Sequence, residues 1–415
     1  MNGECVMSRT SVALQADSHS PANLSMEARW LPPAPPVPTA ELELRITRAR
    51  AEMESAGLDI LILTDQKNIH YFTDYRTMSW AYHARPILAM LTQDRLVVFG
   101  SLTESKLIES APRVFSSVLY NGYLPEAVDT IADQVGAIRA SHRRIALDHG
   151  PDMLGRGSLH LVSTLNRLSS SGEAISAVEL LWRVRLIKTP FEAEMKKIAF
   201  DIVNRAFDQS VAKAYVGIPE YELCQMMQAQ IYLNGAENAP PIAMLFADGD
   251  FFYGRHPSER RLREGHYIWT DFRATYGGYP ADRNRIARCG DPSQWEIDTY
   301  TGVRSLTIEL ANSFRAGLRC CDVFSKFQRF WADAALGQIY GQVTRIGHGG
   351  GLDVTEPPSI SASDETIIES GMIFHIEPKL EKDGAVFQFE EVIFVREDGI
   401  EFLSDLSPET VPVIK

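Results

Sequence analysis

The segment HYIWTDFRATYGGYPADRNR (residues 266–285) carries two aspartates in a sequence typical of a β-hairpin. The midpoint between Asp271 and Asp282 falls between Tyr276 and Gly277. In a symmetric antiparallel hairpin the two aspartates would therefore lie directly opposite each other on one face. Carboxylates in that arrangement repel each other unless a cation lies between them. The segment predicts either a cation site or two ordinary aspartates at a solvated strand end.

A second acidic pair occupies FHIEPKLEKDGAVFQFEEVIFV (residues 374–395). Asp-Gly at positions 383–384 is a strong signal for a two-residue type I′ turn. In a hairpin closed there, Glu377 lies opposite Glu390, while Glu391 lies opposite Ile376 and points to the other face. We therefore predict that Glu390 is the partner of Glu377. Glu391 is either an acid that supports the site or a surface charge, and we favour the surface charge.

His348 lies between these hairpins, in the glycine run IGHGGGLD (residues 346–353). The glycines indicate a backbone path too tight for larger side chains. A histidine alone is more often a packed structural residue. Here it completes a set of metal-ligand types, because burying four carboxylates without compensation is costly and divalent cations would compensate. The predicted ligands are Asp271, Asp282, His348, Glu377 and Glu390.

Composition narrows the class of protein. The 415 residues are 45% hydrophobic, which allows a large core and two domains. The net charge is −13 and no basic cluster stands out, so we expect no nucleic-acid partner. No apolar run is long enough to span a bilayer, and residues 1–20 lack the apolar centre of a secretory signal. The odd number of cysteines, five, without a C-x-x-C pattern, indicates reduced thiols in a cytoplasmic protein.

The chain divides into three segments. Residues 1–40, with the proline-dense stretch WLPPAPPVPTAE (30–41), predict a flexible leader. Residues 41–183 alternate helical and strand patterns, which predicts an α/β domain. Residues 184–415 begin with a helix at Thr189-Pro190 and end in strand-rich sequence, which predicts an α+β domain with an antiparallel sheet. No internal sequence repeat is evident.

Together these motifs resemble the pita-bread metallohydrolases (peptidase family M24), which include methionine aminopeptidase, Xaa-Pro aminopeptidase, prolidase and creatinase. The resemblance covers about residues 41–415, includes RLIKTPFEAEMKKIA (185–199), and follows the family's ligand order Asp, Asp, His, Glu, Glu. It implies a creatinase-like N-terminal domain, a pita-bread catalytic domain and a homodimer. It also implies two divalent ions (Mn²⁺, Fe²⁺, Co²⁺ or Zn²⁺) bridged by Asp282 and Glu390, with Glu377 carrying a proton.

The sequence also departs from the family pattern. Relatives that are peptidases carry a second histidine seven positions after the ligand histidine, where this chain has Thr355. Thr355 can donate one hydrogen bond to a substrate but cannot carry a proton near neutral pH. A further catalytic histidine of the family corresponds either to His256 or to no residue, in which case His256 is a solvated loop residue.

Two more residues are expected near the substrate. Arg273 either binds a substrate carboxylate or neutralises the acidic cluster from outside, and we slightly favour the second role. Tyr253 is expected to form part of a substrate-pocket wall, although aromatic residues are more often core. Asp353, close to His348, is a possible base for an elimination, but an aspartate in a turn is the favoured interpretation.

The resemblance implies a metal-dependent amide or peptide hydrolase, similar to Xaa-Pro aminopeptidase or dipeptidase. A hydroxide bridging the metals would attack the carbonyl of a short-peptide or small-molecule substrate. Thr355 motivates an alternative, a non-peptidase enzyme on the same fold that resembles creatinase, ectoine hydrolase or dimethylsulfoniopropionate lyase. A binding protein without catalytic activity is a third hypothesis, disfavoured because all five ligand positions are filled.

Overall fold

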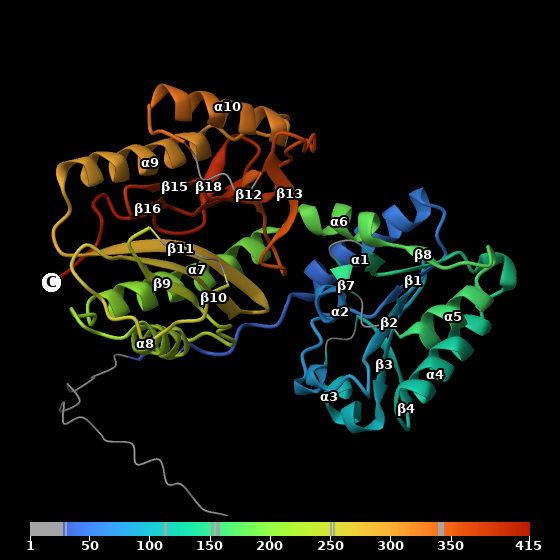
Figure 1. The fold of residues 1–415 in the computed structure, drawn as a ribbon. Coiled ribbons are helices and arrows are strands. Elements are labelled where there is room, and N and C mark those ends of the chain that lie inside the picture. The colour runs from blue at the N-terminus through green and yellow to red at the C-terminus, as the bar shows by residue number, and fades with distance from the viewer. Residues whose placement is uncertain are drawn as a thin grey trace, which may run out of the picture.

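The computed structural model describes residues 28–29, 31–111, 114–150, 153–154, 158–249, 251, 254–338 and 344–415. Figure 1 shows two parts, an α/β part in blue to green and a larger α+β part in green to red. This architecture confirms the predicted fold class. The chain passes from one part to the other between α6 (Val178–Leu186) and α7 (Pro190–Val211).

The N-terminal part is built on a mixed six-stranded sheet of order β4-β3-β2-β1-β5-β8. Its strands alternate their side chains between two apolar layers. Ile60 and Ile62 of β1 pack in the layer formed with α4 and α5, whereas Leu61 and Leu63 pack with α1 and α6. The strands are β1 (Ile60–Leu63), β2 (Leu88–Leu91), β3 (Leu96–Ser101), β4 (Ser116–Tyr120), β5 (Ile145–Leu147) and β8 (Ile175–Ser176).

Helices cover both faces of this sheet and connect its strands. They are α1 (Thr39–Ser55), α2 (Gln66–Thr73), α3 (Ser105–Glu109), α4 (Leu124–Gly136) and α5 (Leu159–Leu168), with short 3₁₀ turns η1 (Met78–Ala81), η2 (Leu102–Glu104) and η3 (Ala140–His142). Strands β6 (His149–Gly150) and β7 (Met153–Leu154) pair with each other in a separate antiparallel ribbon.

The C-terminal part contains two similar halves, each with two helices followed by antiparallel strands. The first half comprises α7, α8 (Glu220–Leu233), β9 (Ala243–Ala247), β10 (Tyr267–Tyr276) and β11 (Tyr279–Cys289). The second comprises α9 (Gln294–Asn312), α10 (Cys320–Asp333), β12 (Arg345–Gly349), β13 (Glu356–Ser361), β14 (Ile373–Ile376), β17 (Glu391–Val395) and β18 (Ile400–Phe402). The hairpin of β15 (Lys379–Lys382) and β16 (Ala385–Gln388) packs against α9, β10 and β11, and β19 (Val413–Ile414) pairs with β11.

The backbone repeats between the halves although the sequence does not. Gly217 follows α7 with φ +96°, and Gly317 follows α9 with φ +91°. Each glycine is followed two residues later by an isolated antiparallel bridge, at Pro219 and at Arg319. The repeat is therefore maintained by a left-handed glycine and strand pairing, which permit different side chains around them.

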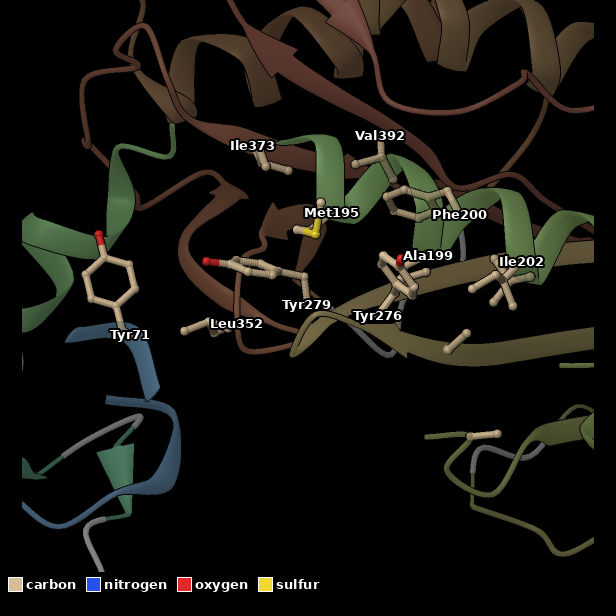
Figure 2. Packing of buried hydrophobic residues seen from close by; sticks show 14 of the residues in the cluster. Tyr71, Met195, Ala199, Phe200, Ile202, Tyr276, Tyr279, Leu352, Ile373 and Val392 are labelled. Carbon is tan, nitrogen blue, oxygen red and sulfur yellow. The ribbon is translucent and has the colours of Figure 1, made fainter. Parts of the chain in front are cut away.

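Helix α7 begins where Thr189 and Pro190 predicted it. The Thr189 amide donates to Glu192 Oε2 at 3.0 Å and the Glu192 amide donates back to Thr189 Oγ1, which forms a capping box. Ala199 and Phe200 of α7 then pack onto one face of β10 and β11, near Tyr276 and Tyr279 (Figure 2). That face of the sheet is closed, so a functional site must use the other.

A buried arginine joins the two parts. Arg45 on α1 donates to the Tyr71 carbonyl and to the Tyr279 hydroxyl, both at 3.0 Å. Figure 2 shows the Tyr279 hydroxyl directed toward the segment that carries Tyr71.

Among the described residues, none of the helices is long and apolar enough to cross a bilayer. The four cysteines in the described part of the chain are free thiols, and Cys5 lies outside it.

Candidate metal centre

The first hairpin has a different register from the predicted one. Asp271 pairs with Asn284, and Asp282 pairs with Arg273, so the prediction of directly opposed aspartates was wrong. The turn is centred on Gly277 and Gly278, with φ of +61° and +83°. A turn centred on Tyr276 and Gly277 would force a tyrosine into the left-handed region, which costs about 1–2 kcal/mol. The two aspartates instead become diagonal neighbours on one face of the sheet.

The second hairpin has the predicted register. Asp383 and Gly384 have φ of +49° and +82°, as a type I′ turn requires, and Lys379 pairs with Gln388. Farther from the turn, Ile376 pairs with Glu391 in the ladder between β14 and β17. Since both ladders share one register, Glu377 and Glu390 lie opposite each other at the break between them.

His348 on β12 points toward these acids. Its Nε2 lies 3.4 Å from Glu377 Oε1 and 3.8 Å from Asp282 Oδ2. Its Nδ1 lies 2.8 Å from the Gly349 carbonyl, which can only accept, so Nδ1 carries the proton and Nε2 is available as a ligand. A Cβ on Gly347 would meet the His375 carbonyl oxygen at 2.1 Å. The glycine run is therefore the tight path that the sequence indicated.

The carboxylates repel one another strongly. Burial, and then the charge of Asp282, raise the pKa values of Asp271 and Glu390 well above the ordinary range. The same two causes raise the pKa of Glu377 to about 7. Asp271 Oδ1 is buried with no hydrogen-bond partner in the described part of the chain. These features fit a cation, because a positive charge would stabilise the ionised acids and satisfy the orphaned oxygen.

A histidine that the sequence analysis missed completes this cluster. Asp282, His348, His375 and Glu390 each offer one ligand atom, and these atoms lie within 4.8 Å of one another. His375 Nδ1 lies 2.6 Å from Glu390 Oε1, and its ring stacks on His348 at 4.8 Å between centroids. The sequence did contain a signal, since His375 and Glu377 are two residues apart on a strand and so share a face.

Arginines surround the acids, and their contacts resolve two alternatives. Arg273 Nε donates to Asp282 Oδ1 at 3.1 Å, which supports the neutralising role. Arg283 Nη1 donates to the Glu390 carbonyl at 2.6 Å. Glu391 was expected on the surface, but it is fully buried, accepts from the Ser407 amide at 2.8 Å and lies 3.6 Å from Arg283. The surface prediction was wrong because both faces of β17 are covered.

Two of the remaining predicted site residues are exposed, and a third falls outside the described part of the chain. Thr355 is exposed on the segment before β13, and His256 is exposed on the segment after β9. Tyr253 lies outside the described residues. Asp353 forms ion pairs with Lys67 and, at 2.6 Å, with Arg185, so its carboxylate is engaged rather than free to act as a base.

Family models match both parts of the chain. Residues 194–397 match metallopeptidase family M24, and residues 45–187 match the creatinase/prolidase N-terminal domain. Together these matches span most of the described residues. The chain belongs to metallopeptidase family M24 and is a hydrolase of that family.

Individual relatives are distant. The chain is 23% identical over 372 residues to an uncharacterized peptidase of Staphylococcus aureus (strain USA300), covering 87% of this chain and 98% of that protein. It is 26% identical over 259 residues to the Xaa-Pro dipeptidase of Pyrococcus furiosus, and the match covers 61% of this chain and 73% of that protein. Its fold is similar to that of an Xaa-Pro dipeptidase from Bacillus anthracis, with a TM-score of 0.77 at 23% identity. The match covers 90% of this chain and 100% of that chain.

Proposed function

We propose that this protein is a dinuclear metal-dependent dipeptidase that cleaves short peptides of the Xaa-Pro type. The observation that carries the proposal is the convergence of His348 and mutually repelling buried carboxylates on one face of the C-terminal part. Two of the similar proteins reported above are Xaa-Pro dipeptidases, which supports this substrate class.

The residues proposed to hold the ions are those predicted from sequence: Asp271, Asp282, His348, Glu377 and Glu390. When bound, divalent ions supply Lewis-acid activation of water and of the scissile carbonyl. The surrounding side chains fix the geometry of these ligands. Arg273 holds Asp282 from the open side, and Arg283 holds the Glu390 backbone from the buried side.

Glu377 is the group that we propose moves a proton. Its side chain is 25% exposed, whereas those of Asp282 and His348 are 8% and 2% exposed. Its partial exposure leaves the carboxylate within reach of a substrate, and a carboxylate in that position can accept a proton from water and pass it to a leaving amine. Exposed Thr355 and His256 remain proposed contacts for the substrate or its leaving group.

The test combines metal analysis with a substrate panel. Exhaustive chelation is expected to abolish activity, and reloading with Mn²⁺, Fe²⁺, Co²⁺ or Zn²⁺ to restore it with about two ions per chain. Asp271→Asn should lower kcat roughly 100-fold or more and reduce the bound metal. Asp291→Asn is the matched control, because the Asp291 side chain is 83% exposed and its ion pair is with Lys415 rather than with a proposed ligand. Activity and bound metal should both stay unchanged in this variant.

The panel contains Xaa-Pro dipeptides, creatine, ectoine and dimethylsulfoniopropionate. Efficient turnover of the dipeptides alone supports the proposal. Turnover of one of the other compounds with the dipeptides left intact supports the alternative motivated by Thr355. Activity that survives complete metal removal would contradict both functions.

A further inference from the structure

Two buried oxygen atoms without partners belong to directly opposed residues of the first hairpin. Asp271 on β10 pairs with Asn284 on β11, and the side chains of such a pair project from the same face of the sheet. Among the described residues, Asp271 Oδ1 and Asn284 Oδ1 are both buried and have no hydrogen-bond partner. Asn284 is only 1% exposed, so bulk water does not satisfy its oxygen. Such buried, unsatisfied polar atoms are uncommon and costly.

The contacts of Asn284 fix which end of its side-chain amide is left without a partner. The amide nitrogen Nδ2 donates to the Thr270 backbone carbonyl at 2.8 Å. A carbonyl oxygen can only accept, so the nitrogen must face it and the amide oxygen must lie on the other side. An ionised carboxylate also only accepts. Ionised Asp271 and Asn284 therefore cannot satisfy each other, and both oxygens need a cation or a donor from outside.

The side chain of Asn284 lies on the face of the sheet that carries the proposed metal ligands. Asp282 and Asn284 are two residues apart on β11, and alternation along a strand places both side chains on one face. Arg283 between them points to the opposite face, where its guanidinium lies 5.6 Å from the centre of the Phe200 ring on α7. Asn284 is therefore directed away from α7 and toward the acidic cluster.

Three of the proposed ligands are neighbours of Asn284. Asp271 is its partner across the hairpin, and Asp282 is its neighbour along the strand. Burial and then the charge of Asp282 raise the pKa of Glu390, and the backbone amide of Asn284 partly counters them, so this carboxylate also lies close to Asn284. The orphaned amide oxygen thus belongs to the same buried polar cluster as the acids.

An amide oxygen suits some divalent ions better than others. Hard ions with six ligands, such as Mn²⁺, accept neutral carbonyl oxygens, whereas Zn²⁺ is most often four-coordinate. A neutral ligand also adds no charge to carboxylates that already repel one another. An amide oxygen beside Asp271 would therefore complete the coordination of such an ion without increasing the repulsion.

We propose that Asn284 Oδ1 is a further metal ligand of this centre and binds the same divalent ion as Asp271. The inference rests on the metal site of the proposed function and extends its ligand set beyond the carboxylates and His348. It implies that Asn284 favours Mn²⁺ over Zn²⁺, because an extra oxygen benefits an ion that takes more than four ligands.

The experiment measures the binding of Mn²⁺ and Zn²⁺ to the metal-free, full-length protein by titration calorimetry. Asn284→Leu replaces the amide with an apolar group of similar shape. This variant should lower the Mn²⁺ affinity about tenfold or more, with a smaller loss for Zn²⁺. Asn284→Asp lacks the amide donor to Thr270 but keeps an oxygen, so it should bind Mn²⁺ at least as tightly as the wild type.

Asn234→Leu is the matched control. Asn234 is also only 1% exposed, and its Nδ2 likewise donates to a backbone carbonyl, that of Gln230, at 2.8 Å. It follows α8, which carries none of the proposed ligands. The affinities of this variant for both ions should equal those of the wild type.

The outcomes separate this inference from the proposed function. If the wild type binds divalent ions and folded Asn284→Leu keeps its Mn²⁺ affinity, or loses affinity equally for both ions, the additional ligand is overturned while the metal centre stands. A loss in Asn284→Asp as large as in Asn284→Leu would also overturn it, because the amide donor rather than the oxygen would then matter. If the wild type binds no divalent ion, the proposed function fails as well.

A crystal structure of the Mn²⁺-loaded wild-type protein tests the same contact without any substitution. We expect Asn284 Oδ1 to lie about 2.0–2.6 Å from an ion that Asp271 also binds, which is the range of metal–oxygen bonds. An occupied centre in which Asn284 Oδ1 instead accepts from a water or a protein donor would overturn the proposal, even if the variants did not fold.

Discussion

At the scale of single residues, His375 shows how one side chain controls a ligand. It is completely buried, stacks on His348 and bonds Glu390 Oε1 through Nδ1 at 2.6 Å. Burial, followed by the charge of Lys196, lowers the pKa of His375 well below the ordinary value, so the ring is neutral. A neutral ring that donates from Nδ1 fixes the carboxylate of Glu390 in one orientation.

Removing that hydrogen bond should weaken metal binding. We expect His375→Phe to lower the affinity for divalent ions about 10- to 100-fold, because groups that orient metal ligands typically contribute that much. His375→Gln keeps a donor and should recover part of the loss. Titration calorimetry on metal-free protein measures both, with exposed His142→Gln as the control. Unchanged affinity in folded His375→Phe would show that Glu390 needs no such support.

At the scale of elements, two hairpins differ in how well their registers could be predicted. Asp383-Gly384 is a turn signal that fixes the pairing of Lys379 with Gln388. The first hairpin contains Tyr276, Gly277 and Gly278, and the symmetric position of the two aspartates suggested the wrong centre. The energy of the turn, rather than the spacing of the acids, decides the register.

The second turn allows a direct measurement. In Gly384→Ala the alanine would have to adopt φ +82°, and its Cβ would lie 3.1 Å from the Asp248 carbonyl oxygen. We therefore expect the free energy of unfolding to fall by about 1–2 kcal/mol. Gly399→Ala is the matched control, since nothing lies within 4 Å of its Cβ and its φ is not in the left-handed region. Denaturant unfolding of the metal-free proteins should separate the two. Equal stabilities would contradict the importance of this turn.

At the scale of the whole molecule, a buried ionic network joins the two parts beside the site. Glu356, only 2% exposed, accepts from Arg185 at 2.6 Å and from Lys188 at 2.8 Å. Arg185 also donates to Asn68 on α2 at 2.9 Å. Glu356 therefore connects the linker after α6, the N-terminal helix α2 and the segment that carries Thr355.

Breaking this network should destabilise the whole protein. Glu356→Gln leaves Arg185 and Lys188 buried without a full counter-charge, so we expect a loss of about 3 kcal/mol of unfolding free energy. Asp322→Asn is the control, because it removes a pair exposed to water and should change stability far less. Burial alone would raise the pKa of Glu356, but the charges of Lys188 and Arg185 lower it to about 2. The contribution of Glu356 is therefore complete above pH ~4.5 and lost as the pH falls toward 2. Unfolding at pH 7 and pH 3 measures the difference, which should shrink at the lower pH.

The sequence by itself determined the fold class and the register of the second hairpin, and it supplied the five ligand-type residues that we propose hold the ions. These follow from local rules, since turn chemistry, strand alternation and helix capping act within a few residues. Only the tertiary structure decided that His375 joins the cluster and that Glu391 is buried. Each of these depends on segments far apart in the chain, whose packing sets burial and charge, and no local pattern records that packing.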